Sequence, residues 1–249
     1  MTPVIFLGAG PGAADLITLR GRRALEEAGA VLYAGSLVNP DILSCCSRDC
    51  LLKDSAGLDL ESQVAFMMEA RGKGLSVVRL HSGDPSLYGA VREQMRELKK
   101  RGVPYEVIPG VTSAIGVLEA AGIPVTHRNI ARDFHVFTGH ISHEGGEGLS
   151  GDYNLYAKLP GTLIFLMGLS NLEEIVKRLM NGGKDGETPA AVVTDGTLSR
   201  MRVVRASLKD LPDAVRKAGL TPPGIIAVGE VCAFHFTSMV PGALTGITV

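Results

Sequence analysis

The feature that most constrains the fold is a unit that occurs three times in the first half of the chain. In each unit a short apolar run, typical of a buried strand, ends in a glycine-containing turn that opens a helical pattern. Alternating strands and helices of this kind predict an α/β fold with a mostly parallel sheet, which binds ligands at the carboxyl ends of its strands. The three runs and their turns are Val4–Leu7 with Gly8–Gly12, Ser76–His81 with Ser82–Pro85, and Tyr105–Ile108 with Pro109-Gly110.

The second half keeps strand and helix patterns but arranges them in longer, hairpin-like stretches, which favour a mixed sheet. A composition break near Gly122–Arg128 marks the expected boundary, so the predicted α/β domains are residues 1–124 and 125–249. The polar, glycine-rich segment Gly139–Gly151 is typical of a surface loop. The strand-like segments are Phe134–Thr138, Thr162–Met167, Ala190–Thr194, Arg202–Ala206 and the run Gly224–Phe234.

Charge and composition argue against several classes of function. Lys and Arg total 25 against 26 Asp and Glu, a net charge of −1, so no global positive field attracts nucleic acid or an anionic membrane. No apolar run approaches the roughly 20 residues of a membrane span, and Met1 leads directly into a strand-like segment without a secretory signal pattern. We therefore expect a cytoplasmic protein. Its four cysteines fit a reducing compartment, and their spacing offers no fourth metal ligand, so we expect ordinary thiols and no metal site. They are Cys45, Cys46, Cys50 and Cys232.

The first turn, Gly8–Ala13, formally matches the G-x-G-x-x-[G/A] fingerprint of dinucleotide-binding folds. Two features argue against a nicotinamide cofactor. Pro11 has no backbone N–H to offer a pyrophosphate, and the second strand ends at Gly35 without the acid that binds a ribose hydroxyl. A tight strand-to-helix turn with no ligand is the alternative.

The second and third turns carry polar side chains at the same predicted sheet edge. Asp84 either orients a ligand or only caps the helix that follows, and Thr112 and Ser113 are equally natural caps. His81, at a strand end, is a candidate base or ligand. Three turns that converge on one edge indicate a ligand site better than any one of them. The remaining histidines are more typical of surface or structural positions; they are His127, His135, His140, His143 and His235.

Four segments occur in a recognisable order in the first half of the chain, and the resemblance that they begin extends to about Phe234: G-A-G-P-G, D-L-I-T-L-R-G, G-D-P and P-G-V-T-S-A. In this combination they resemble the tetrapyrrole methylases of cobalamin and sirohaem synthesis. The resemblance implies two α/β domains with S-adenosylmethionine in the cleft between them. It also implies a homodimer, a tetrapyrrole substrate and S-adenosylhomocysteine as a product.

The resemblance assigns roles to matching positions of this chain. His81, Tyr88 and Glu93 are candidate bases that remove a proton after methyl transfer. Expected contacts of the macrocycle and its peripheral carboxylates are Ser36, Arg79, Arg128 and Arg132, since guanidinium groups bind carboxylates; the alternative for the three arginines is a surface role in solubility. Expected contacts of S-adenosylmethionine are Pro11, Ser82, Gly83, Asp84, Leu87, Thr112, Ser113, Met167, Gly196 and Ala227.

The two halves resemble different members of this family. Tyr33–Val38 and His81–Ala90 look like the precorrin-4 C11-methyltransferases, whether cobalt-containing or metal-free, whereas uroporphyrinogen-III methyltransferases carry an Asp-Arg pair where Gly35 and Ser36 stand. Segments such as Thr188–Thr197 look more like the uroporphyrinogen enzymes. Because the loops of the first half face the macrocycle in this family, we expect C11 methylation of precorrin-4 or cobalt-precorrin-4. The alternatives are C2 and C7 methylation of uroporphyrinogen III, a non-catalytic S-adenosylmethionine-binding protein and, more distantly, a nicotinamide oxidoreductase.

Overall fold

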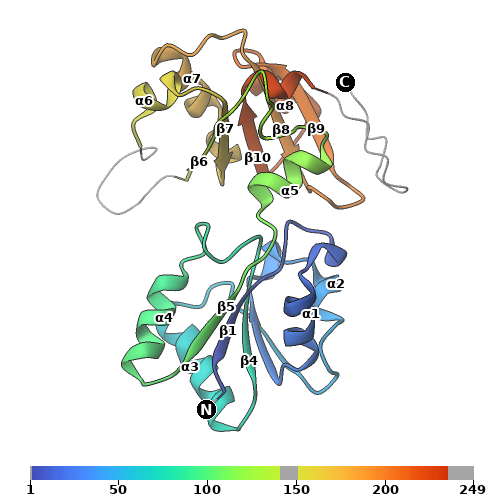
Figure 1. The fold of residues 1–249 in the computed structure, drawn as a ribbon, viewed down its shortest axis with the longest axis vertical. Coiled ribbons are helices and arrows are strands. Elements are labelled where there is room, and N and C mark those ends of the chain that lie inside the picture. The colour runs from blue at the N-terminus through green and yellow to red at the C-terminus, as the bar shows by residue number, and fades with distance from the viewer. Residues whose placement is uncertain (1, 141–150, 235–249) are drawn as a thin grey trace. The chain divides into compact units, whose positions relative to one another are not determined.

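The computed structural model describes residues 2–140 and 151–234, and the chain divides into two compact units, residues 1–113 and 114–249. The division falls earlier than residue 124 because helix α5 (Ser113–Ala120) packs into the second unit. Its Ala114, Val117 and Leu118 are buried in a hydrophobic cluster with strands of that unit. Each unit holds one five-stranded sheet with helices (Figure 1), which confirms the predicted α/β class.

The sheet of the first unit is parallel throughout. The chain leaves β1 towards β2 on one side and leaves β4 towards β5 on the other, so the winding direction reverses between β4 and β1. In such sheets ligands bind outside the carboxyl ends of the strands at this reversal. In the order β3-β2-β4-β1-β5, the strands are β3 (Leu51–Asp54), β2 (Ala30–Tyr33), β4 (Val77–His81), β1 (Val4–Gly8) and β5 (Tyr105–Ile108).

Helices cover both faces of this sheet (Figure 1). Side chains alternate along each strand, so Leu7 of β1 joins the core under α1 and α2, while Val4 and Phe6 join the core under α3 and α4. A 3-10 turn (Ala14–Leu16) follows the first glycine turn and precedes α1. The helices are α1 (Leu19–Glu26), α2 (Pro40–Leu43), α3 (Leu60–Gly72) and α4 (Val91–Lys100).

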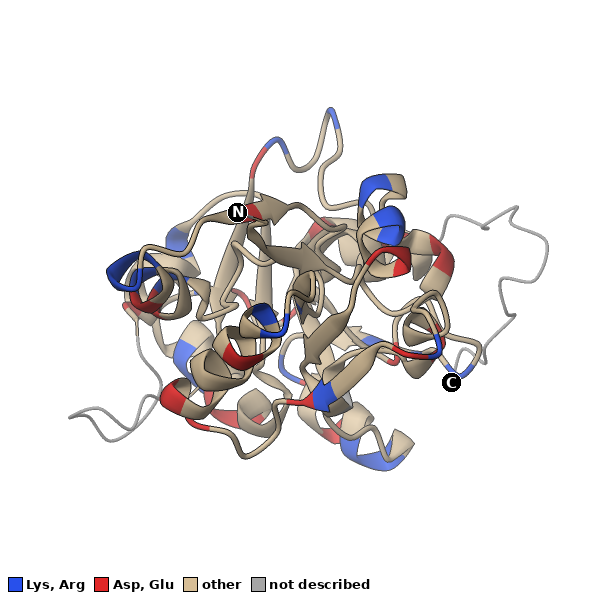
Figure 2. Ribbon diagram, turned by 90° about the horizontal axis from the view of Figure 1, so that it is seen from below, with Lys and Arg blue, Asp and Glu red and all other residues tan. Residues whose placement is uncertain are grey.

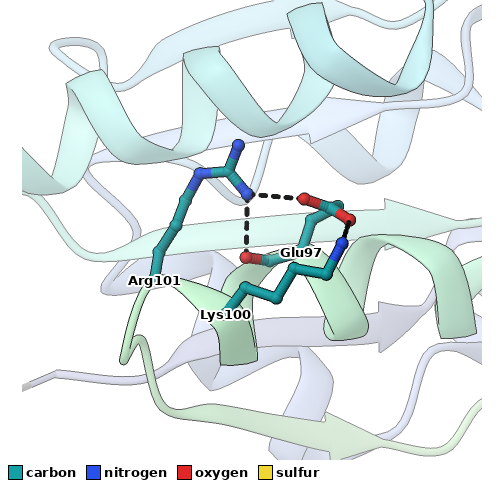
Figure 3. A network of polar contacts seen from close by, with 3 residues as sticks. All are labelled: Glu97, Lys100 and Arg101. Carbon is teal, nitrogen blue, oxygen red and sulfur yellow. Dashed lines mark hydrogen bonds and ion pairs between the residues drawn. The ribbon is translucent and has the colours of Figure 1, made fainter.

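Helix α4 ends in a network of charges at the surface. The Glu97 carboxylate accepts a hydrogen bond from Lys100 Nζ at 2.7 Å and another from Arg101 Nη1 at 2.8 Å (Figure 3). Hydrogen bonds from Lys100 and then from Arg101 lower the pKa of Glu97 to about 2. The charged side chains of this helix form a solvated face, as its sequence predicts, and cations suit a helix C-terminus.

The sheet of the second unit is mixed. Strands β6 and β7 pair in parallel, and the other three pairs are antiparallel. Because β7 and β8 are both antiparallel to β10, they run in the same direction, and their carboxyl ends lie at one edge of the sheet. In the order β6-β7-β10-β8-β9, the strands are β6 (Phe134–Thr138), β7 (Thr162–Leu166), β10 (Gly224–Val228), β8 (Pro189–Thr194) and β9 (Arg202–Ser207).

Two hydrophobic clusters cover the faces of this second sheet. One packs α6 (Tyr153–Lys158), α7 (Leu172–Asn181) and α8 (Leu211–Ala218) against one face, and the other packs α5 and a 3-10 turn (Glu230–Ala233) against the opposite face. In the part of the chain that the structure describes, no helix is long and apolar enough to cross a membrane. Figure 2 shows that the helices carry both Lys or Arg and Asp or Glu.

Candidate ligand site

Three glycines bring the carboxyl ends of β1, β4 and β5 into backbone contact. A Cβ atom on Gly8 would lie 2.6 Å from Gly110 Cα and equally close to the Gly83 carbonyl oxygen. A Cβ atom on Gly110 would lie 2.8 Å from Gly8 Cα. These separations are shorter than real Cβ contacts, so neither position accepts a side chain. We call Gly8, Gly83 and Gly110 the glycine cradle, because their backbones pack against one another at the carboxyl ends of three strands.

Main-chain hydrogen bonds join the first two turns. Gly83 N–H donates to the Gly10 carbonyl at 2.8 Å, and Gly10 N–H donates to the Gly83 carbonyl at 3.2 Å. Ala9 N–H donates to the His81 carbonyl at 2.7 Å. Gly10 and Gly83 have φ values of 83° and 62°, in the left-handed region that favours glycine. The two turns are therefore held in one arrangement by their backbones.

Asp84 joins the second turn to the third. Its Oδ2 accepts a hydrogen bond from Gly110 N–H at 2.9 Å, and its Oδ1 accepts one from Ser86 N–H at 2.8 Å. Burial raises the pKa of Asp84, but hydrogen bonds from the Ser86 side chain and from the Gly110 backbone outweigh it and bring the pKa below its ordinary value. Because α4 begins only at Val91, Asp84 does not cap that helix. The ionised carboxylate braces two turns of the site.

Backbone strain gathers at the carboxyl ends of strands in both units. Among the described residues, all non-glycine positions with positive φ lie in the loops that follow β4, β7 and β8. Such conformations cost about 1–3 kcal/mol each and cluster at functional sites. No pattern of residue types in the sequence indicated them. They are Tyr88, Ala90, Met167, Asp195 and Thr197.

His81 is buried at the end of β4, with 4% of its surface exposed, and its ring stacks on Phe6. Its Nε2 has no hydrogen-bond partner among the described residues. Burial, assisted by the positive charge of Arg79, lowers the pKa of His81 to about 3. The imidazole is therefore neutral at physiological pH and weakly basic, which argues against the expected role of His81 as the base.

Arg79 is also buried, with 5% of its surface exposed. Its Nε donates to Gln94 Oε1 at 3.2 Å, and its Nη1 donates to the carbonyls of Leu32 and Leu80 at 3.3 and 3.2 Å. Burial lowers the pKa of Arg79 to about 10. The guanidinium thus serves as an internal donor beneath α4. This placement does not fit the expected ion pair with a carboxylate of the substrate.

The other expected residues of the first unit lie around the glycine cradle. Ser82 and Pro11 are half-buried in its turns, and Leu87 and Tyr88 are exposed in the loop that follows the second turn. A Cβ atom on Gly83 would lie 3.6 Å from Ser113 N and 3.9 Å from Thr112 Cα, so the third turn is in contact with the second. Glu93 is exposed on α4. The backbone of Ser36 lies in a 3-10 turn (Gly35–Leu37) after β2, and its side chain is not described.

The expected residues of the second unit differ in accessibility. Met167, directly after β7, has a φ of 56° and is 52% exposed. Gly196 follows β8 at the same sheet edge, where a Cβ atom would collide with Val117. Ala227 is fully buried in β10, which pairs with β7 and β8 on its two sides, so this position does not fit the expected ligand contact. Arg128 and Arg132 are exposed before β6.

The predicted surface loop, the remaining histidines and the cysteines add no residue to the candidate site described above. Most of the loop expected over Gly139–Gly151 lies outside the described residues, as do His143 and His235. His127 stacks near Phe234 with ring centroids 5.0 Å apart. Within residues 2–140 and 151–234, no group of three or more His, Cys, Asp or Glu could hold a metal ion.

The family model for Tetrapyrrole (Corrin/Porphyrin) Methylases matches residues 3–212. The chain belongs to this family. The methylase is 41% identical to uroporphyrinogen-III C-methyltransferase of Methanocaldococcus jannaschii, over 92% of this chain and 96% of that protein. It is 38% identical to cobalt-precorrin-4 C(11)-methyltransferase of the same organism, over 92% of this chain and 87% of that protein.

Solved structures agree with these relatives. Cobalt-precorrin-4 methyltransferase CbiF matches the methylase with a TM-score of 0.86 and 33% identity, over 92% of this chain and 95% of that chain. Uroporphyrin-III C-methyltransferase of Thermus thermophilus, solved in complex with S-adenosylhomocysteine, matches with a TM-score of 0.77 and 34% identity, over 93% of each chain. The methylase is a methyltransferase and has the tetrapyrrole methylase fold that its sequence motifs predict.

Proposed function

We propose that this methylase transfers a methyl group from S-adenosylmethionine to C11 of precorrin-4 or cobalt-precorrin-4 in cobalamin biosynthesis. The observation that carries the proposal is the likeness to CbiF, with a TM-score of 0.86 over 92% of the chain. The turns of the first unit, which surround the glycine cradle, carry the sequence resemblance to the C11 enzymes.

The edge of the first sheet fits S-adenosylmethionine. This molecule ends in an amino acid on one side and in a nucleoside on the other, and both ends bind well to main-chain N–H and carbonyl groups. The glycines of the cradle let the three turns pack directly against one another, so their main-chain groups gather at the carboxyl ends of β1, β4 and β5. The proposed contacts from the first unit are Pro11, Ser82, Gly83, Asp84, Leu87, Thr112 and Ser113, and those from the second are Met167 and Gly196.

The chain's own contribution is to hold the reactants in line. When bound, S-adenosylmethionine supplies an electrophilic methyl group. The brace from Asp84 to Gly110 N–H, at 2.9 Å, keeps the turns that surround the ligand in fixed positions. Positioning of this kind contributes roughly 7–11 kcal/mol towards lowering a barrier. Tyr88 and Glu93, both exposed, are the bases that we propose, and exposed Arg128 and Arg132 are the proposed partners of substrate carboxylates.

A second candidate function is methylation of uroporphyrinogen III at C2 and C7. The observation that favours it is the 41% identity to the uroporphyrinogen-III enzyme of Methanocaldococcus jannaschii, against 38% for the C11 enzyme of that organism. Both reactions use the same donor, so the donor site does not distinguish them.

The deciding experiment incubates the purified protein with S-adenosylmethionine and, separately, precorrin-4, cobalt-precorrin-4 and uroporphyrinogen III. We expect one added methyl group on a precorrin-4 species, with ¹³C-labelled donor locating it at C11 by NMR. Two methyl groups on uroporphyrinogen III would support the second candidate instead. Donor binding by calorimetry without transfer to any of the three would contradict both and identify a non-catalytic binding protein.

We also propose that the methylase works as a homodimer in the cytoplasm. The family resemblance supports the dimer, and analytical ultracentrifugation should find a particle of two chains; a monomer at working concentration would contradict it. The free thiols Cys45, Cys46, Cys50 and Cys232 suit a reducing compartment.

A further inference from the structure

Asp54 is a fixed carboxylate at the same sheet edge as the glycine cradle. It is the last residue of β3, next to the end of β2. Its Oδ1 accepts hydrogen bonds from Gly35 N–H at 2.9 Å and from Ala56 N–H at 2.8 Å. Two donors on one oxygen fix the orientation of the group. Oδ2 accepts no hydrogen bond from any described residue. Because Asp54 is exposed, this oxygen is open to a ligand or to solvent.

The carboxylate of Asp54 occupies the space of a side chain at position 35. A Cβ atom on Gly35 would collide with both of its oxygens. The absence of a side chain at position 35 is therefore what admits the Asp54 carboxylate to the end of β2. Because Gly35 does not have positive φ, its backbone would accept an L-residue, and the carboxylate alone excludes one.

The carboxylate is not required to hold its own segment in place. Ser55 N–H and Ser55 Oγ–H both donate to the Tyr33 carbonyl, at 2.8 and 2.9 Å, so these bonds already fix the chain after β3 against the end of β2. Burial lowers the pKa of nearby Arg79, and the charge of Asp54 offsets only part of this effect, while Arg79 donates its hydrogen bonds to neutral acceptors. Among the described residues, Asp54 has no ion-pair partner within 4 Å.

We propose that Asp54 contacts the substrate, with Oδ2 accepting hydrogen bonds from the ring N–H groups of a metal-free macrocycle. The inference rests on the proposed function and deepens it, because it selects precorrin-4 over its cobalt complex. The periphery of such a macrocycle carries carboxylates, which Asp54 repels, whereas the metal-free ring presents N–H donors at its centre. Asp54 therefore turns the ring centre towards the end of β2 and leaves the periphery for cations.

The first test is Asp54→Asn, which keeps an oxygen for Gly35 and Ala56 N–H but removes the charge. We expect kcat/KM for precorrin-4 to fall about tenfold to a hundredfold, the range for loss of a charge-assisted hydrogen bond. The Kd of S-adenosylmethionine and the Tm should stay unchanged. Cobalt-precorrin-4, whose ring nitrogens bind the metal, should lose less. The matched control is Asp59→Asn, since Asp59 also accepts a backbone N–H, from Ser62 at 2.8 Å, and Asn caps a helix equally well.

The second test moves the carboxylate to the neighbouring strand. Asp54→Ala should lose activity, and Gly35→Asp alone should lose it because two carboxylates crowd one space. The double variant Asp54→Ala/Gly35→Asp places one carboxylate back in that space, and we expect it to recover most of the kcat/KM for precorrin-4. Recovery distinguishes a substrate contact from the local hydrogen bonds of Asp54, which the double variant does not restore.

Each outcome bears on a separate claim. A wild-type protein that methylates no tetrapyrrole overturns the proposed function. An active wild type with unchanged Asp54→Asn kinetics, an equal loss with cobalt-precorrin-4, or a parallel loss of donor affinity and Tm overturns the role of Asp54 and leaves the proposed function standing.

Discussion

His81 is a neutral histidine enclosed at the end of β4, and its protonation is linked to folding. Burial lowers its pKa to about 3 in the folded protein, whereas the unfolded chain has a pKa of about 6.5. As the pH falls below about 6.5 the unfolded state binds a proton first, so stability decreases. The contribution of neutral His81 is complete above this pH and is lost as the pH falls towards 3.

We predict that His81→Asn removes part of the acid sensitivity of the protein. Between pH 7.5 and 5.5 the wild type should lose about 1 kcal/mol of unfolding free energy more than the variant, from linkage at this one group. Urea unfolding at both pH values measures the difference. An identical pH dependence in the two proteins would show that His81 titrates normally.

Asp84 gives a second prediction at the scale of one residue. Asp84→Ala leaves the Gly110 N–H without its acceptor and frees the third turn, so we expect roughly tenfold weaker S-adenosylmethionine binding by calorimetry with the fold retained. Asp185→Ala is the matched control, because Asp185 makes the same local bond, to Glu187 N–H at 2.9 Å, without bracing a second turn. Equal effects of the two substitutions, or unchanged donor affinity in Asp84→Ala, would remove Asp84 from the site.

Which residues surround the site was partly predictable from the sequence. Strand alternation alone groups Arg79 and His81 with Val77 on one face. That this face is covered by α4 was not predictable, because strand alternation does not tell which helix packs on a face; in the structure Gln94 of α4 accepts a hydrogen bond from Arg79. Asp54 was not predicted either, since its importance comes from the empty position at Gly35 on another strand.

At the scale of elements, the three turns of the cradle act as one packed unit. Gly110→Ala would place a Cβ atom against the Gly83 carbonyl and 2.8 Å from Gly8 Cα, so the turns must separate. We expect a lower Tm, by an overpacking cost of about 1–3 kcal/mol or more, and loss of S-adenosylmethionine binding. Gly72→Ala at the end of α3, where a Cβ atom meets nothing within 4 Å, should leave both unchanged. Normal donor binding by Gly110→Ala would show that the cradle can relax.

Elements with a strong apolar pattern were predictable, and those fixed by tertiary contacts were not. The ranges of β2, β5 and α3 agree with their sequence patterns. Strand β3 was not predicted. It is the outermost strand of its sheet, and its Leu51 and Leu52 are both exposed, so apolar and polar residues do not alternate along it. Helix α4 begins only at Val91, because Tyr88 and Ala90 before it take left-handed conformations, which residue preferences disfavour.

At the scale of the whole molecule, the position of α5 decides where the chain can be divided. We predict that a fragment of residues 112–249 folds with a higher Tm than a fragment of residues 125–249, which lacks Val117 and Leu118 from its core. Loss of two such buried side chains costs several kcal/mol. Thermal unfolding followed by circular dichroism measures the difference. Equal Tm values would place α5 outside the folding unit, in agreement with the boundary expected at residue 124.

The glycine cradle also limits how this methylase can be redesigned. Enzymes are commonly made to accept bulkier alkyl donors by trimming side chains that crowd the transferred group. Gly8, Gly83 and Gly110 have no side chains to trim, and the backbones around them already touch. Extra room must instead come from truncating exposed side chains among the proposed donor contacts, such as Leu87 and Met167.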